Sequence, residues 1–173
     1  MSEPTFDVAA AHRWFAVECN NEAWDLIEQE SISEAERDRL LNLAHTSHLH
    51  WSRVGDQIHA LRSAYLLATA YLKARRSLEA GRYAMRAYDA VQTIGESSVK
   101  PFDRACVIGA TVAAARLRGD RMVLPKLEKL FDDVVRSVED EEERGLVEAL
   151  YGPEGIVPPL PDREPVAEGS GKS

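Results

Sequence analysis

The chain has 173 residues, of which 45% are hydrophobic and 29% are charged, so it has the size and composition of one globular domain. Its formal charge of −8 argues against a nucleic-acid partner, because such binding needs an electropositive surface that releases counterions. No stretch approaches the roughly 18 apolar residues of a membrane span, and residues 1–7 lack the basic start of a signal peptide. These features predict a cytoplasmic protein without a membrane partner.

The first predicted helix covers about residues 5–29 and is apolar on two sides. Its core side carries residues at three- and four-residue spacings, which are Phe15, Ala16, Cys19, Ala23, Leu26 and Ile27. Trp14, Val17 and Trp24 lie on the opposite side. A second layer or a second subunit has to cover that side, so one expectation is a homo-oligomer formed through Trp14 and Trp24.

The second predicted helix begins after Ser33, which forms a capping box with Glu36. Its inward stripe consists of Leu40, Leu41, Ala44, Ser47, His48 and Trp51. Gly55 and Asp56 supply a helix stop and the next N-cap. The first two helices should therefore form a hairpin, and helices over about 57–74 and 77–94 should form a second.

A third hairpin is predicted after Gly95, with Pro101 in a first helical turn and Gly119 in the connecting turn. A last short helix should hold Leu146, Val147, Leu150 and Tyr151 against the open end of the array. Residues 152–173 hold most of the prolines and end in Gly-Ser-Gly, which is typical of a flexible tail. We therefore divide the chain into one domain, 1–151, and a tail, 152–173.

The second hairpin resembles a tetratricopeptide (TPR) repeat. Ala68, Ala80 and Ala87 stand at the small positions of such a repeat, and Tyr71 stands at a larger one. Arg75 replaces the glycine that normally ends the first helix of the repeat. The resemblance implies an all-α fold of stacked antiparallel helical hairpins, a TPR-like right-handed array of about seven helices.

Two further stretches, 13–24 and 45–51, resemble a family of uncharacterised bacterial TPR-like helical proteins. The family's recurring motif falls here on Glu18, Asn21, Trp24, His45, Ser47, His50 and Trp51, whereas His48 falls at a variable position. The resemblance implies a ligand-binding site at these residues and no particular reaction.

All five histidines lie in the first three predicted helices. If the first two helices pair antiparallel, His12 and His50 lie about equally far from their turn, as do Glu18 and His45. His12, Glu18, His45 and His50 are therefore candidate ligands for a transition metal such as Zn, Fe, Cu or Mn. Against one site, His45 and His50 project from opposite flanks of their helix, so the histidines can equally be packed or surface residues.

Two functions of different classes follow from this sequence. The first is a protein or peptide interaction module without a cofactor, because stacked helical pairs present extended concave surfaces. The second is a small-molecule-binding or metal-binding protein. If it is an enzyme, it would be a metal-dependent or acid/base one that uses His45, His50 and Glu18.

Overall fold

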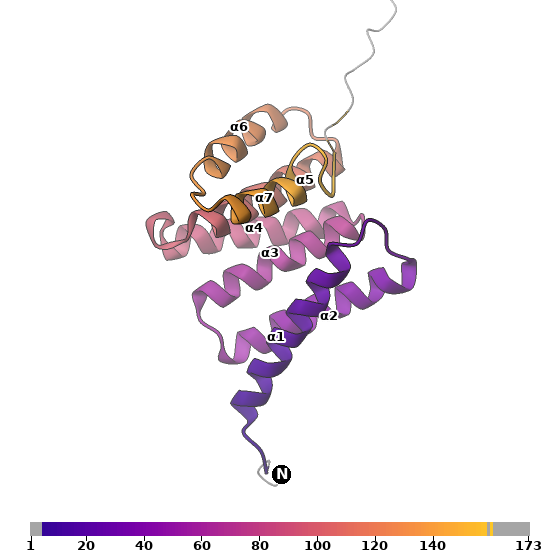
Figure 1. Ribbon diagram of the computed structural model, residues 1–173, viewed down its shortest axis with the longest axis vertical. Coiled ribbons are helices and arrows are strands. Elements are labelled where there is room, and N and C mark those ends of the chain that lie inside the picture. The colour runs from indigo at the N-terminus through magenta and orange to yellow at the C-terminus, as the bar shows by residue number, and fades with distance from the viewer. Residues whose placement is uncertain (1–4, 159, 161–173) are drawn as a thin grey trace, which may run out of the picture.

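The computed structural model describes residues 5–158 and 160, and this part of the chain is all-helical (Figure 1). It contains one short 3-10 helix and seven α-helices, which confirms the predicted fold class. Their bounds are α1 Val8–Ile27, α2 Glu34–Val54, α3 Gln57–Lys73, α4 Ser77–Ile94, η1 Glu96–Ser98, α5 Pro101–Arg118, α6 Leu124–Val135 and α7 Glu141–Tyr151.

The helices pack as successive hairpins, α1 with α2, α3 with α4 and α5 with α6. Figure 1 shows these hairpins stacked along the long axis of the molecule. α3 and α5 contact each other and also the helices on either side, so they form the centre of the core. Their fully buried side chains include Leu61, Leu66, Leu67, Leu72, Val107 and Val112.

Local sequence signals fix most helix ends. The predicted capping box is present, since the Ser33 side chain accepts a hydrogen bond from the backbone of Glu36 and the Glu36 carboxylate accepts one from the backbone of Ser33. The Asp56 side chain likewise caps α3. Gly119 ends α5 with a left-handed φ of 73°.

Arg75 adopts the left-handed backbone conformation that normally favours glycine. Its φ is 59°, which makes it the sole non-glycine with positive φ among the described residues. The backbone N–H of Arg76 bonds to the carbonyl of Tyr71, and that of Arg75 bonds to the carbonyl of Leu72. This pair of bonds is a Schellman motif with arginine at the position that favours glycine.

Two expected core contacts are wrong. Phe15 is 44% exposed, because it lies at the outer edge of the α1–α2 hairpin, between Trp14 and the ring of His50 on α2, and not in the buried core. Leu146 is 53% exposed, because α7 turns Val147 and Tyr151 towards the core. On the second apolar side of α1, Trp24 packs against the core, whereas Trp14 is 57% exposed and Val17 is 39% exposed, so self-association through this side stays a prediction.

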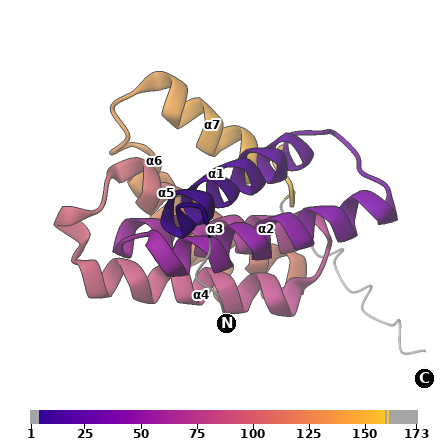
Figure 2. The ribbon, with the colours of Figure 1, turned by 90° about the horizontal axis from the view of Figure 1, so that it is seen from below.

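The last helix docks on α5, on the same side of the stack as α1 (Figure 2). The Tyr151 ring lies against Gly109, where an added Cβ would be 2.5 Å from Cδ2 of that ring. The hydroxyls of Tyr151 and Thr69 are 2.6 Å apart, which ties α7 to α3. α7 therefore occupies part of the face on which a stacked array was expected to present its open groove.

The chain continues to pack after the predicted boundary at residue 151. Val157 is buried, and the Arg116 side chain donates to the carbonyls of Tyr151, Gly152 and Val157. Part of the predicted tail thus packs on the folded domain, while residues 159 and 161–173 lie outside the described residues. None of the described helices combines the length and the apolar character that crossing a membrane requires.

Candidate functional site

The structure distributes the predicted ligand-binding residues over several places. Glu18 is half-buried and Asn21 is exposed on α1, and Asn21 accepts a hydrogen bond from the neighbouring Asn20. Ser47 is buried and donates to the backbone carbonyl of Ala16 at 2.8 Å, so it joins α2 to α1. These residues do not share one pocket with the histidines.

His12 and His50 form a contact, as their equal distances from the α1–α2 turn predicted. Their Nδ1 atoms are 2.7 Å apart, so one imidazole donates and the other accepts. Desolvation and the nearby His12 lower the pKa of His50. The other proposed metal ligands do not join the pair: among the residues that the structure describes, no three His, Cys, Asp or Glu side chains are arranged to hold a metal ion.

Trp51 belongs to the end of α2. Its ring lies on the ring of His59, with centroids 4.0 Å apart. His59 in turn contacts the carboxylate of Asp56, with 2.7 Å between Nδ1 and Oδ1. Trp51 and His59 therefore help to hold the connection between α2 and α3.

His45 belongs to a separate aromatic group between α2, α3 and α4. Its Nε2 is 2.8 Å from the hydroxyl of Tyr71. The rings of Tyr71 and Tyr83 are stacked, with centroids 5.6 Å apart and planes inclined by 11°. The His45 ring meets both tyrosines edge-on, so α2 supplies an imidazole to a pair of phenols from the second hairpin.

His48 lies one turn further along α2 and faces the same tyrosine pair. Its ring centroid is 6.4 Å from that of Tyr83, and its Nδ1 is 2.8 Å from the hydroxyl of Ser63. The Ser63 hydroxyl also lies 3.1 Å from the carbonyl of Ala60, so this serine joins the His48 ring to the backbone of α3.

Two arginines of α4 complete this group. The guanidinium carbons of Arg82 and Arg86 lie 5.5 and 5.1 Å from the centroid of the Tyr83 ring, a cation–π arrangement. Both side chains are exposed, and neither pairs with a carboxylate among the described residues. We call these residues the His-Tyr-Arg cluster, which consists of His45, His48, Tyr71, Tyr83, Arg82 and Arg86.

The charges around the cluster are mixed: burial, Tyr83 and Glu79 raise the pKa of Tyr71, whereas the arginines act on the histidines. Burial lowers the pKa of His45, and the charge of Arg82 lowers it further. The pKa of His48 is lowered by burial, then by His45 and Arg86. Both imidazoles are therefore held neutral beside fixed cations, and a bound anion would oppose both charge effects.

Sequence reasoning missed most of this cluster, although it singled out His45. Tyr71 was assigned to a position of a TPR repeat, and Arg82 and Arg86 were not among the predicted site residues. The available signal was the spacing of Arg82, Tyr83 and Arg86, which puts both cations one turn apart around an aromatic ring. That spacing does not show that α2 places the imidazoles of His45 and His48 beside the two arginines.

Trp24 lines a different site, a cleft between α1 and α7. It shares an apolar hollow of about 180 Å³ with Tyr65, Phe102, Cys106 and side chains of α7. Below it the buried carboxylate of Asp103 receives two hydrogen bonds from Arg62, at 2.9 and 3.0 Å. Burial raises the pKa of Cys106, so this thiol is protonated and unreactive.

No protein-family model, no curated protein and no solved structure matches this chain.

Proposed function

We propose that this protein is a TPR-like helical-repeat module that binds an acidic segment of a partner protein through the His-Tyr-Arg cluster. The observation that carries the proposal is local: Arg82 and Arg86 stand on one face of a chain with a formal charge of −8, and neither forms an ion pair with a described carboxylate. Free cations beside stacked aromatic rings are a common means of holding carboxylates in peptide recognition.

The cluster also has the rigidity that recognition requires. Tyr83 is 6% exposed and is fixed between Tyr71 and the two histidines. The arginine side chains rest on this ring, so less conformational entropy is lost when they engage a carboxylate. An acidic partner segment would lie across α2 and α4, away from the face that α7 occupies.

The proposal favours a peptide over a nucleic acid. The net charge of −8 repels a polyanion at long range, whereas a short acidic segment contacts the local excess of positive charge. The partner would be acidic over a few residues and would bind more weakly as the salt concentration rises.

Fluorescence anisotropy with a labelled peptide of six glutamates tests the proposal. The Arg82→Gln/Arg86→Gln double variant should weaken binding by about tenfold or more, equivalent to about 1.4 kcal/mol for two charge pairs. The Arg37→Gln/Arg53→Gln variant is the matched control, because it removes the same charge from exposed positions outside the cluster. It should bind almost like the unaltered protein.

Several outcomes would overturn the proposal. Equal weakening in both double variants would show that bulk charge alone attracts the peptide. Equal binding of a six-lysine peptide would show that the cluster does not select acids. Tighter binding of polyuridylate RNA than of the glutamate peptide, lost in Arg82→Gln/Arg86→Gln, would assign the cluster to a nucleic acid.

A further inference from the structure

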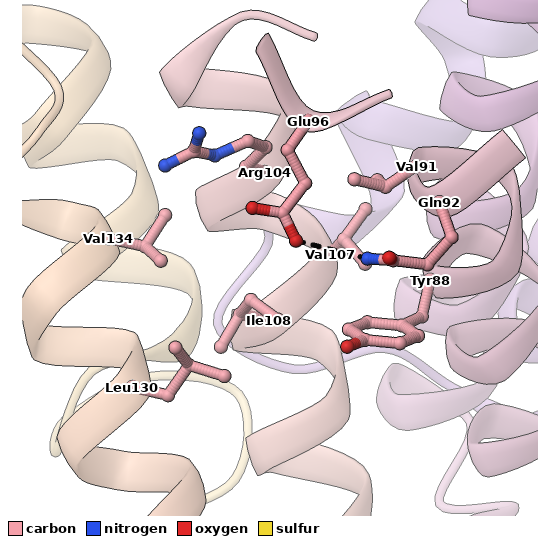
Figure 3. Close-up of a pocket in the computed structure, with 9 residues that line it drawn as sticks. All are labelled: Tyr88, Val91, Gln92, Glu96, Arg104, Val107, Ile108, Leu130 and Val134. Carbon is pink, nitrogen blue, oxygen red and sulfur yellow. Dashed lines mark hydrogen bonds between the residues drawn. The ribbon is translucent and has the colours of Figure 1, made fainter. Parts of the chain in front are cut away.

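A separate hollow lies between α4, α5 and α6, with a volume of about 200 Å³. Figure 3 shows side chains of α6 on one side of it, side chains of α4 on the other, and Ile108 of α5 between them. Its apolar floor consists of Val91, Val107, Ile108, Leu130 and Val134. Helices from two successive hairpins thus build one apolar recess.

The size of this recess matches a single large apolar side chain. A cavity of roughly 150 Å³ is enough to hold benzene, so about 200 Å³ can receive a leucine or phenylalanine side chain. Leu130 is 40% exposed at the rim, and Tyr88 is 36% exposed opposite it. Apolar surface therefore remains in contact with water until an occupant enters.

The polar side chains at the mouth of the recess differ in whether they have a partner. The carboxylate of Glu96 accepts a hydrogen bond from the Gln92 amide at 3.1 Å, and Figure 3 shows Arg104 extending separately at the rim. The Arg104 guanidinium has no carboxylate partner among the described residues. An occupant with a carboxylate beside its apolar group would thus find an available cation.

The recess and the His-Tyr-Arg cluster lie on opposite flanks of the same helix. Arg86 faces Tyr83 and the α2 side, whereas Gln92 lines the recess towards α5 and α6. These positions are six residues apart, which corresponds to about 9 Å along the helix axis, and a segment that passes from one flank to the other also has to run around the helix, which is about 10 Å wide. An extended peptide advances about 3.3 Å per residue, so about five residues separate the two contacts.

We infer that the recess between α4, α5 and α6 is an anchor pocket for one large apolar side chain of the acidic partner segment, with Arg104 pairing to a carboxylate next to that anchor. The inference rests on the proposed function, because it assigns both contacts to one segment. It adds the chemistry of the partner: acids, then an apolar residue about five positions further on, followed by an acid.

The test compares two labelled peptides, Glu-Glu-Ala-Ala-Ala-Ala-Leu-Glu and Glu-Glu-Ala-Ala-Ala-Ala-Ala-Glu, by fluorescence anisotropy. The leucine peptide should bind about tenfold more tightly, because it buries its anchor side chain. Leu130→Phe fills the recess from a half-exposed position and should remove this preference. Leu146→Phe, at an exposed position of α7, is the matched control and should keep the preference.

The outcomes separate the two proposals. If neither peptide binds, the proposed function fails. If both bind with equal affinity, and Arg82→Gln/Arg86→Gln weakens both, the function stands and the anchor pocket is refuted. Arg104→Gln gives a second check, because it leaves the apolar floor of the recess unaltered. It should weaken the binding of both peptides and leave the ratio of their affinities unchanged. A lack of effect would refute the role of Arg104.

Discussion

Replacing Arg75 with glycine should stabilise the protein, although it deletes the whole side chain. Arg75 holds a φ of 59° at the end of α3, where the Schellman hydrogen bonds of Arg75 and Arg76 require a left-handed residue. An L-residue with a side chain pays about 1–2 kcal/mol for this conformation. Glycine removes that cost and adds about 0.4–1 kcal/mol of conformational freedom to the unfolded chain.

The net gain for Arg75→Gly is therefore about 1 kcal/mol, or a rise in Tm of about 2–4 °C for a chain of this size. Urea denaturation followed by circular dichroism measures the gain in unfolding free energy. Arg75→Ala is the control for lost charge, since it removes the same guanidinium beside Lys73 and keeps the left-handed side-chain cost. Arg76→Gly is the control for glycine itself, because φ of Arg76 is −104°.

The reasoning predicts that Arg75→Gly is more stable than Arg75→Ala, and that Arg76→Gly, at an N-cap with negative φ, gains less stability than Arg75→Gly. Equal stability of the glycine and alanine variants at position 75 would refute it, because the gain would then come from removing a charge. A loss of stability in Arg75→Gly would refute it as well.

Further predictions concern pH, the docking of α7 and the thiols. The pKa values of His45, His48 and His50 are lowered in the folded protein, so the unfolded chain binds more protons below pH 6.5. The free energy of unfolding should therefore fall from about pH 6.5 towards pH 5. In urea titrations at several pH values, His45→Gln/His48→Gln should flatten this fall. Gly109→Ala should lower the free energy of unfolding by about 1–3 kcal/mol, because the added Cβ would overlap the Tyr151 ring. Gly145→Ala is the control and should be neutral or stabilising, because nothing lies within 4 Å of its added Cβ. Equal effects of the two variants in denaturation would contradict the docking of α7. Ellman's reagent should titrate Cys19 in the native protein and Cys106 only after unfolding, since Cys106 is 1% exposed; fast reaction of both would contradict its burial.

The sequence was sufficient for the helices, because their ends depend on a few neighbouring residues. Ser33 with Glu36, Asp56 and Gly119 each act within one turn of the backbone, and each occurs where it was expected. Amphipathic spacing then identified the hairpins. Arg75 was noticed as a departure from a repeat pattern, and the structure shows that the backbone keeps the left-handed turn regardless.

The position of α7 could not be predicted in this way. Its docking depends on Gly109 leaving space for Tyr151 and on Thr69 meeting the hydroxyl of that tyrosine, and these residues are distant in sequence. Nothing in the local pattern of α5 distinguishes a glycine that receives a ring from one that is merely tolerated. The open groove expected of stacked hairpins was therefore assigned without the helix that partly fills it.

The candidate site was half predictable for a similar reason. His12 and His50 could be paired by counting residues from a single turn, and their contact follows from that count. The cluster around Tyr83 needs three helices at once, and the sequence gives no measure of how α2 rotates against the second hairpin. Reading each helix separately assigned Tyr71 to a position of the repeat and gave Arg82 and Arg86 no role in a site.

The most direct test of acid recognition by the cluster is a pH titration of the histidine ring protons by NMR, with and without the six-glutamate peptide. A carboxylate bound at Arg82 and Arg86 offsets the charges that disfavour protonation, so the pKa values of His45 and His48 should rise on binding. His50, which contacts His12 outside the cluster, should keep its titration curve. Unchanged titration of His45 and His48 at saturating peptide, or an equal shift for His50, would contradict the proposed binding site.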